Sequence, residues 1–506
     1  MVLAVEMHNI TKKFGNLIAN NNINFELHWG EVHGLCGENG AGKTTLMNIL
    51  YGLYQPDAGK IIINGKECRL NSPKDAISAG IGMVHQHFSL VPSMTVAENI
   101  VIGNPPKKKN GLVDKKGSIE IVKELSAKYG LDINPAAIVK LLPVGLQQRV
   151  EILKALYLGA NILIMDEPTA VLTPQEISQL FVTFEALKKK NKSIILITHK
   201  LKEVKEATDR ITVMRLGKIT GHANTADIDE HEIARMMVGR EVLLRVNKEY
   251  KKSGDTILKV SNISCNDNRG VQVVKDITLE VRSGEIVGIA GVQGNGQTEL
   301  IEAITGLRNV YQGSIEILGN TLGGKNLPAR CRSLGVGHIS EDRQNIGSAL
   351  NASIRDNFLI NIYKKKEFKR GIFLDYKAID DTCIKLLEQF DVRYGKIQDP
   401  AYSLSGGNLQ KLIVAREIYA KPRLLIAAQP TRGVDIGATE FIHKKLIEQR
   451  NDGNAVLLVS NDLSEIMSLS DRIYVIYKGT FVGEVNQTDA TEEQLGLWMA
   501  GITTSY

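Results

Sequence analysis

The feature that most constrains the fold of this 506-residue chain is an internal repeat. The segment WGEVHGLCGENGAGKT, residues 29–44, returns as SGEIVGIAGVQGNGQT, residues 283–298, at an offset of 284 − 30 = 254. Three further motif pairs follow in the same order at an offset of 430 − 168 = 262. Four motifs in one order predict a tandem duplication of about 250 residues, too long a period for a solenoid, so each copy is a globular domain.

These three pairs also help to place the domain boundaries. They are Val144–Gln148 against Gly406–Gln410, Met165–Thr169 against Ala427–Thr431, and Ile197–His199 against Val459–Asn461. A charged stretch poor in apolar residues (RVNKEYKKSGD, 245–255) separates the copies. We therefore predict a first domain over 1–245, a linker over 246–255 and a second domain over 256–506.

Composition excludes several classes of protein. Apolar residues make up 43% and charged residues 23%, and no stretch approaches the roughly 18 apolar residues that a membrane-spanning helix needs. The start of the chain shows no basic patch followed by an apolar segment, so we expect no secretory signal. The five cysteines are scattered without a CxxC pair, which argues against a zinc or disulfide framework and favours a reduced cytosolic compartment. The net charge of +6 permits an anionic partner without demanding one, and we expect no nucleic acid.

Within each copy, short β-branched runs alternate with longer helical patterns. Examples are KIIIN at 60–64, ILIM at 162–165 and IILIT at 194–198. This alternation predicts an α/β fold with a mainly parallel sheet. The pattern before Gly30 indicates an antiparallel β piece that leads each copy, and the stretch from about 90 to 145 indicates a helical insertion.

The first copy contains the phosphate-binding pattern GxxxxGK[ST] between an apolar strand and a helix. Its glycines let backbone N–H groups surround phosphates, and the helix N-terminus adds positive potential. Lys43 is predicted to reach the β- and γ-phosphates, and the Thr44 hydroxyl to ligate Mg²⁺. The predicted nucleotide-binding residues of this loop are Gly37, Glu38, Asn39, Gly40, Ala41, Gly42, Lys43, Thr44 and Thr45.

A buried strand, ILIM, then ends in two adjacent acids, Asp166 and Glu167. Desolvated carboxylates are costly unless a cation compensates them. Asp166 is therefore predicted as the carboxylate on the Mg²⁺ side. Glu167 is predicted to position and polarise the attacking water.

Three further side chains complete the predicted site. Gln86 follows the strand over 81–85 and is predicted to contact Mg²⁺ and the water, and His199 follows the strand over 194–198 and is predicted to contact the γ-phosphate. Both stand at strand ends of one parallel sheet, where ligands bind. Phe14 is predicted to stack on adenine, although an ordinary core aromatic is the alternative.

These residues, taken in order, resemble the ATP-binding subunits of ABC transporters over nearly the whole chain, twice. The resemblance is closest to the fused double-ATPase subunits of nucleoside and simple-sugar importers. The segments VHQHF (84–88), VGLQQRVEI (144–152) and AAQPTRG (427–433) favour the nucleoside branch, because the sugar branch usually has an acid where this chain has His87. A sugar importer remains the main alternative, and a soluble tandem-ATPase translation factor a distant one.

The resemblance implies two tandem P-loop ABC ATPase domains that close around ATP and Mg²⁺ and hydrolyse the ATP. It implies two integral membrane permease subunits as direct partners, docked near Gln86 and the helical insertion. It also implies an extracytoplasmic substrate-binding protein as an indirect partner. The expected location is peripheral, on the cytoplasmic face of the cell membrane.

The second copy departs from the motifs. Gln297 replaces Lys43, Ala428-Gln429 replaces the acid pair and Asn461 replaces His199. The position of Gln86 is interpreted as Ile339, with Glu341 nearby.

The signature that precedes the acid pair shows the opposite asymmetry. It is nearly intact in the second copy, where Ser405 and Gly407 are predicted to contact nucleotide across a head-to-tail interface, whereas the first copy has Pro143 in place of the serine. We therefore predict one composite site that hydrolyses ATP and one degenerate site. Two unrelated degenerations without a functional division remain the alternative.

Overall fold

The computed structural model describes residues 2–15, 17–85, 88–169, 172–241, 248 and 253–502. The chain divides into two compact units, Met1–Val242 and Leu243–Tyr506, which are described here one at a time. Of the predicted linker over 246–255, only Lys248 and residues 253–255 lie among the described residues, so its extent stays a prediction. Among the helices that are described, none combines the length and the apolar character needed to cross a membrane.

The centre of unit 1 is a six-stranded sheet in the order β10-β9-β3-β8-β7-β6, parallel except for the edge strand β10. A second, antiparallel sheet in the order β2-β1-β4-β5 confirms the β piece expected near the start of the copy. The strands of both sheets are β1 (Val5–Phe14), β2 (Leu17–Leu27), β3 (Val32–Gly37), β4 (Ala58–Ile63), β5 (Lys66–Cys68), β6 (Ile81–Val84), β7 (Ile162–Asp166), β8 (Ser193–Thr198), β9 (Arg210–Arg215) and β10 (Lys218–Asn224).

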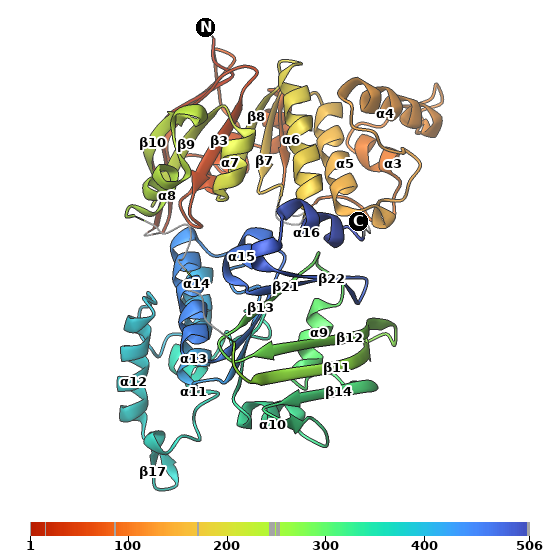
Figure 1. Cartoon of the computed structure of the whole chain (residues 1–506). Coiled ribbons are helices and arrows are strands. Elements are labelled where there is room, and N and C mark those ends of the chain that lie inside the picture. Colours follow the sequence, from red (N-terminus) through yellow and green to blue (C-terminus); the bar gives the residue numbers. More distant parts are fainter. Residues whose placement is uncertain are drawn as a thin grey trace. The chain divides into compact units, whose positions relative to one another are not determined.

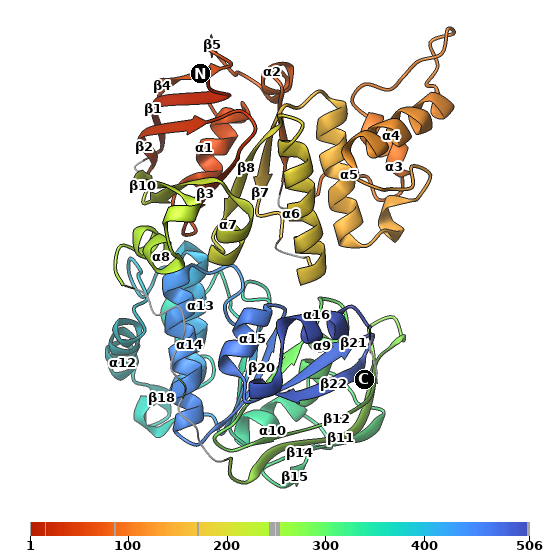
Figure 2. The same ribbon diagram turned by 45° about the horizontal axis from the view of Figure 1, so that its top comes forward.

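The helices of unit 1 cover both faces of its central sheet. They are α1 (Lys43–Leu50), α2 (Pro73–Ser78), α3 (Val96–Val101), α4 (Lys115–Tyr129), α5 (Val144–Tyr157), α6 (Pro174–Lys188), α7 (Leu201–Ala207) and α8 (Glu230–Val238). In Figure 1, α5 and α6 lie beside β7, and α3 and α4 extend from this side as the predicted helical insertion. Figure 2 shows β1, β2 and β4 next to α1, on the other side of the same unit.

Alternation along the central strands explains these two layers. Ile162 and Ile164 of β7 pack into the core beneath α1 and the antiparallel sheet, whereas Leu163 and Met165 pack into the core beneath α5 and α6. All five residues of β7 are buried, up to Asp166 at its carboxyl end. A strand buried on both faces reads as a continuous apolar run, which is why ILIM carried no alternation in the sequence.

Unit 2 repeats this plan with sheets in the orders β12-β11-β14-β15 and β16-β19-β20-β13-β21-β22. A short hairpin of β17 (Lys369–Arg370) and β18 (Phe373–Leu374) is added to its helical insertion. The other strands are β11 (Thr256–Asn266), β12 (Gln272–Arg282), β13 (Ile286–Ala290), β14 (Gln312–Ile317), β15 (Asn320–Thr321), β16 (Val336–Ile339), β19 (Leu424–Ala428), β20 (Ala455–Ser460), β21 (Arg472–Tyr477) and β22 (Thr480–Asn486). The helices are α9 (Gln297–Ile304), α10 (Leu327–Ser333), α11 (Ile354–Leu359), α12 (Tyr376–Gln389), α13 (Gly406–Tyr419), α14 (Ile436–Asn451), α15 (Leu463–Leu469) and α16 (Glu492–Met499).

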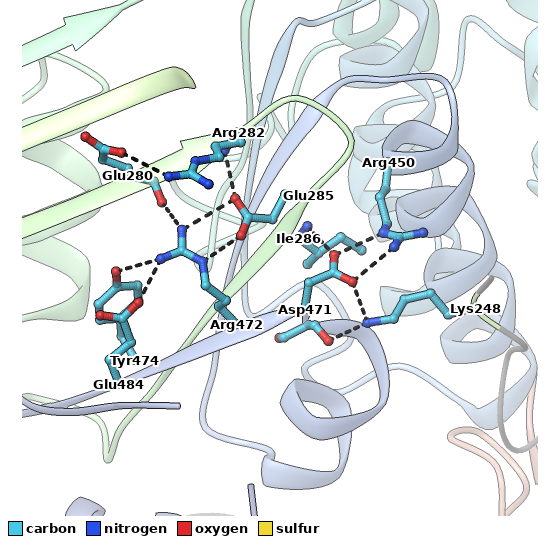
Figure 3. A network of polar contacts seen from close by, with 11 residues as sticks. Lys248, Glu280, Arg282, Glu285, Ile286, Arg450, Asp471, Arg472, Tyr474 and Glu484 are labelled. Carbon is cyan, nitrogen blue, oxygen red and sulfur yellow. Dashed lines mark hydrogen bonds and ion pairs between the residues drawn. The ribbon is translucent and has the colours of Figure 1, made fainter. Parts of the chain in front are cut away.

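A polar network joins strands β13 and β21 of unit 2 to helix α14 (Figure 3). The Asp471 carboxylate accepts a hydrogen bond from the Ile286 N–H at 2.8 Å and two from the Arg450 guanidinium at 3.0 and 3.1 Å. Lys248 adds an ion pair to Asp471 at 3.0 Å and donates to the Leu469 and Ser470 carbonyls at the C-terminal end of α15. Lys248 therefore attaches its part of the predicted linker to unit 2.

Candidate functional site

The phosphate loop of unit 1 lies between β3 and α1, as the sequence predicts. Lys43 is buried, and its Nζ donates to the carbonyls of Gly37 at 2.7 Å and Glu38 at 3.0 Å. Gly42 has a φ of +101°, and a Cβ built there would lie 2.3 Å from the Ala19 carbonyl oxygen. Only glycine fits this close approach, so the loop bends back over its own lysine. Bound phosphates would replace the two carbonyls as acceptors for Lys43.

The acid pair lies beside this loop, at the carboxyl end of β7. Asp166 is the last residue of the strand, and Glu167 follows it with a φ of +45°, a left-handed conformation unusual for a non-glycine residue. The Glu167 N–H donates to the Ile197 carbonyl of β8 at 3.0 Å, which fixes this turn. His199, one residue beyond β8, has its Nδ1 2.8 Å from Glu167 Oε1.

Electrostatics shift the pKa values of the two acids in opposite directions. Burial, reinforced by the neighbouring Glu167 and opposed by Lys43, raises the pKa of Asp166 to about 6. Burial also acts to raise the pKa of Glu167, but the hydrogen bond and charge of His199, with Lys43 and Lys200, lower it overall. Burial lowers the pKa of Lys43, which the charges of Glu167 and Asp166 oppose. At neutral pH both acids are therefore ionised, and the buried negative charge costs more free energy on Asp166 than on Glu167.

The donor set of unit 1 fits a Mg²⁺ ion. The Asp166 carboxylate is a hard oxygen ligand at the same edge of the sheet as the exposed Thr44, and burial makes the ionised carboxylate costly without a cation. Mg²⁺ typically takes one or two carboxylates together with substrate phosphates and water. Thr44 and Asp166 are the residues of this set that would hold it.

Two further predicted contacts involve Phe14 and Gln86. Phe14 ends β1 and is 42% exposed, with its ring edge-on to Tyr54 at a centroid distance of 5.4 Å and Lys12 Nζ at 5.6 Å from its centroid. An exposed ring next to a second aromatic offers a surface for a base, and Tyr54 carried no signal in the sequence. Gln86 lies outside the described residues, so its contact with Mg²⁺ stays a prediction.

The sequence reasoning missed Glu203, a buried carboxylate on α7 that supports the site. It accepts hydrogen bonds from Thr169 and from Thr198 at 2.9 Å, and it pairs with Lys200 at 3.1 Å. Thr169 follows the acid pair and Thr198 precedes His199, so this carboxylate ties the two strand ends together. In unit 2, Glu465 likewise accepts from Thr431 at 2.8 Å. The sequence did carry a signal for this carboxylate, because the separation between Thr169 and Glu203 is the same as that between Thr431 and Glu465.

The loop of unit 2 keeps the backbone while its side chains differ. Gly296 has a φ of +103°, close to the +101° of Gly42. Gln297 is buried and donates to the Val292 carbonyl at 3.0 Å, so it takes over one of the two carbonyl contacts that Lys43 makes. Gln429 keeps the left-handed conformation with a φ of +47°, and its Oε1 accepts a hydrogen bond from the Asn461 N–H at 3.3 Å.

The strand register corrects one prediction for unit 2. Ile339 pairs with Ala427 in the sheet, as Val84 pairs with Met165 in unit 1, so Ile339 corresponds to Val84. Counted from these strand ends, Glu341 occupies the position of Gln86. The interpretation of Ile339 as that position was wrong, because sequence similarity is weak here and only the pairing of parallel strands fixes the count.

The two signatures both begin helices. Ser405 is the N-cap of α13, and its Oγ accepts from the Asn408 side chain at 2.8 Å. Pro143 occupies the N-cap of α5 without a side-chain cap, and the helix forms nonetheless, as expected for a proline at a helix start. The glutamine that follows each signature is used identically: Gln148 donates to Pro168 and Gln410 to Pro430, both at 2.8 Å.

The comparison with known families decides the identity of this fold. The ABC transporter family model matches residues 20–170 and again 274–432, one match in each copy. The chain belongs to the ABC transporter family. As a member with ATP-binding domains, it is an ATP-binding protein and an ATP hydrolase, and the resemblance inferred from its motifs is confirmed.

Curated relatives of this ABC protein match over its whole length. It is 50% identical to the guanosine import ATP-binding protein NupO of Bacillus subtilis, over 99% of this chain and 98% of the relative. It is 47% identical to a nucleoside import ATP-binding protein of Lactococcus lactis, over 98% of both chains. It is 46% identical to a glucose import ATP-binding protein of Haloferax volcanii, over 98% of this chain and 96% of that one.

A solved structure also resembles this ABC protein throughout. It is the complex of an archaeal ribosomal stalk protein with an archaeal ribosome recycling factor, with a TM-score of 0.63 and 18% identity over 98% of this chain and 92% of that chain. At this identity the likeness shows the fold alone. It confirms the predicted α/β architecture of two tandem ATPase domains.

Proposed function

We propose that this chain is the ATP-hydrolysing subunit of an ABC importer, with nucleosides as the cargo. The observation that carries hydrolysis is the 2.8 Å hydrogen bond between Glu167 and His199 beside Lys43 and Asp166. This arrangement keeps Glu167 ionised next to the place where the γ-phosphate and a water would meet. Glu167 would accept a proton from that water, and His199 would hold Glu167 in position.

ATP and Mg²⁺ are the proposed cofactors of unit 1. The loop residues 37–45 would bind the phosphates, and Phe14, with Tyr54 beside it, would hold the base. Thr44, Gln86 and Asp166 would hold Mg²⁺, which would neutralise charge on the phosphates. The chain itself contributes the rigid loop, the buried lysine and the carboxylate that orients water.

The importer role and the cargo rest on the relatives. Two of them, at 50% and 47% identity, are named for guanosine and nucleoside import, and His87 after Gln86 agrees with that branch. The glucose import relative at 46% identity keeps a sugar importer as the alternative. The likeness to the ribosome recycling factor concerns the fold, so it does not support the translation-factor alternative.

As partners we propose two integral membrane permease subunits and, indirectly, an extracytoplasmic substrate-binding protein. The chain would then sit peripherally on the cytoplasmic face of the membrane. We also propose that the intact loop of unit 1 works with the Ser405 and Gly407 signature of unit 2, giving one composite site that hydrolyses ATP. The degenerate loop would then meet the degenerate signature, and the boundary between the domains would fall in 246–255.

The decisive experiment is purification of the tagged chain from mildly solubilised native membranes, followed by reconstitution into proteoliposomes with whatever accompanies it. We expect two multi-spanning subunits and ATP-driven uptake of guanosine or another nucleoside. Uptake of ribose or glucose without nucleoside uptake would favour the sugar alternative. Recovery of ribosomes, or of no membrane protein, would contradict the importer.

A further inference from the structure

The hairpin of β17 and β18 in unit 2 has two exposed apolar side chains at its tip. Ile372 is 93% exposed and Phe373 is 72% exposed. Gly371 begins the two-residue turn with a φ of +68°, which is the glycine position of a type II′ hairpin turn. In Figure 1 the hairpin projects from one end of α12, away from the sheets of unit 2. Large apolar side chains at a projecting tip indicate a contact with something outside the chain.

Contacts at the base hold this hairpin in place. A pair of two-residue strands would not keep its shape alone. Phe368, directly before β17, is fully buried, with its ring edge-on to that of Phe358 at a centroid distance of 6.2 Å. The Asp375 N–H donates to the Phe368 carbonyl at 3.0 Å, and the Asp375 carboxylate caps α12 by accepting from the Ala378 N–H at 3.2 Å. The exposed tip is therefore presented by a buried anchor and a capped helix.

Basic side chains flank the apolar tip. The segment 363–377 contains six basic and two acidic residues, which gives it a net charge of +4. Across the hairpin, Arg370 pairs with Phe373, so a cation and an apolar ring share one face. Both acids are engaged by the protein itself, since Glu367 accepts from the Tyr419 hydroxyl at 2.8 Å and the other caps α12. The exposed basic residues of the segment are Lys364, Lys366, Lys369, Arg370 and Lys377.

The corresponding segment of unit 1 has the same character. Residues 105–116, between α3 and α4, contain five basic residues and one acidic residue, again a net charge of +4. Lys107 forms a bridge with Val113, and the Lys108 N–H donates to the Leu112 carbonyl at 2.8 Å. Leu112 and Val113 are 65% and 50% exposed. Figure 2 shows this segment projecting beyond α4, so each unit has a basic projection with exposed apolar side chains.

The two projections account for more than the net positive charge of the chain. Together they have a charge of +8, whereas the whole chain has +6, so the remaining residues have a net charge of −2. Lysines that serve only solubility are expected to be interspersed with acids over the surface. Here the cations are gathered at two places, and both places also expose apolar side chains. This combination is typical of a surface that binds an anionic partner with an apolar interior.

We propose that the hairpin of unit 2 binds directly to the anionic lipids of a membrane surface, and that the projection of unit 1 does so more weakly. Lysine and arginine side chains would lie among the headgroups, where anionic lipid attracts them. Ile372 and Phe373 would enter the boundary between headgroups and acyl chains. The flexible stems of the lysines allow their charges to stay at the headgroups while the tip enters.

The charges favour lipid over a protein as the partner. Lysine is depleted in the buried parts of protein interfaces, yet it is the commonest residue around this tip. The cytoplasmic segments of membrane proteins themselves have an excess of Lys and Arg, so they would repel a basic hairpin. Anionic headgroups have the complementary charge. This inference goes beyond the proposed function, because it requires no permease subunit.

The test measures cosedimentation of the purified full chain with lipid vesicles. One set of vesicles is an equal mixture of phosphatidylglycerol and phosphatidylcholine, and the other is phosphatidylcholine alone. We expect binding to the mixed vesicles, little binding to phosphatidylcholine, and a loss of binding as salt is raised. Lys369→Gln together with Arg370→Gln should weaken binding about 25-fold, since each cation near an anionic surface contributes about fivefold.

The matched control is Lys325→Gln together with Lys444→Gln, because both lysines are exposed in unit 2, outside the segment 363–377. This variant has the same net charge as the hairpin variant and should bind the mixed vesicles nearly as well as the unchanged chain. A second variant, Ile372→Ser together with Phe373→Ser, should weaken binding roughly tenfold without altering its salt dependence. Thermal unfolding verifies that each variant is folded.

Insertion of the tip has its own readout. Phe373→Trp places an indole at the tip, and its fluorescence should shift to the blue when mixed vesicles are added, beyond any shift of the unchanged chain. The proposal is overturned if this shift is absent, if the hairpin variant and the control variant bind equally, or if the chain binds no vesicles. Binding only to vesicles that also contain permease subunits would assign the hairpin to a protein contact and would overturn it as well.

These outcomes are separate from those of the importer experiment. A chain that binds anionic vesicles through the hairpin, yet recovers no permease and drives no uptake, would contradict the proposed importer and leave this inference standing. A functioning importer whose hairpin variant binds vesicles as well as the control does would do the reverse.

Discussion

The two units of this chain share a backbone and differ in chemistry. Gly42 and Gly296 have the same left-handed φ within a few degrees, and so do Glu167 and Gln429. A left-handed non-glycine residue costs on the order of 1–3 kcal/mol, and both units accept that cost. In each, the N–H of this residue donates to the neighbouring parallel strand, at 3.0 Å in unit 1 and 2.7 Å in unit 2. The backbone geometry of the site is therefore a property of the fold, and the side chains at the proposed catalytic positions differ between the units without loss of that geometry.

The largest expected effect tests the difference at the acid positions. Glu167→Gln should reduce ATP turnover of the assembled transporter by about 10²–10⁴-fold, because the amide cannot accept a proton from the attacking water. Gln429→Ala should leave most of the turnover. Steady-state phosphate release measures both, with thermal unfolding as the control for folding. Similar losses in the two variants would contradict the division into one hydrolytic and one degenerate site.

The next effect concerns the two signatures. Ser405→Ala should lower turnover by about 10- to 150-fold, since one charge-assisted hydrogen bond to phosphate is worth about 1.5–3 kcal/mol. Pro143→Ser, which restores the serine in the other signature, should change turnover little. Because Ser405 also caps α13, Ser405→Asp provides a check: it keeps the cap and adds a charge that repels phosphate. A larger loss in Pro143→Ser would reverse the assignment of loops to signatures.

Substitution of Asp166 tests the comparison through the free energy of unfolding instead of the rate of ATP turnover. Its pKa rises from 3.8 to about 6 in the folded chain, so the folded state holds a proton that the unfolded chain loses between those values. The contribution of Asp166 to the free energy of unfolding therefore falls as the pH rises from 3.8 to about 6. Asp166→Asn should therefore stabilise the nucleotide-free protein at pH 7.5, by at most about 3 kcal/mol, and by about half as much at pH 5. Denaturant unfolding in EDTA measures this, and Ala428→Asp should show the opposite sign in unit 2.

The smallest expected effect concerns Lys248, which has no counterpart among the described residues that contact Asp209 in unit 1. There Asp209 accepts from the Val32 N–H at 2.9 Å and from Lys188 at 2.9 Å. Lys248→Ala should destabilise unit 2 by about 1 kcal/mol, because Asp471 keeps its bonds from Ile286 and Arg450. The exposed Lys444 gives the control variant, Lys444→Ala. A shift in the unfolding midpoint equal to that of the control would show that the attachment at Lys248 contributes nothing.

Most residues of the proposed site were identified from the sequence because they belong to short motifs, and the structure places the described ones at the predicted loop and strand ends. The phosphate loop of residues 37–45 is contiguous, and the conformation of each glycine is set by its immediate neighbours. The acid pair follows directly from an apolar run, and a buried parallel strand places its last residues at the ligand-binding edge. Gln86 and the linker were also predicted from local pattern, and they remain predictions.

What the sequence missed depends on the alignment of distant strands. Glu203 lies on a helix with no motif of its own, and its role follows from its contacts with Thr169 and Thr198. The counterpart of Gln86 was taken to be Ile339, two residues before Glu341, because the match between the copies is weak there. Pairing of β16 with β19 corrected it.

By itself, the sequence determined the duplication, the α/β class, the phosphate loop and the difference in motif residues between the two copies. Each of these features can be recognised from the identity and spacing of residues that are close together in the chain. Only the tertiary structure decided which side chains meet: His199 with Glu167, and Glu341 with Thr298 and Arg432. These contacts join residues that are 32 to 91 positions apart. The register of the parallel strands decides which of these residues come close together. That register depends on hydrogen bonds between segments far apart in the sequence, so it cannot be read from the pattern of neighbouring residues.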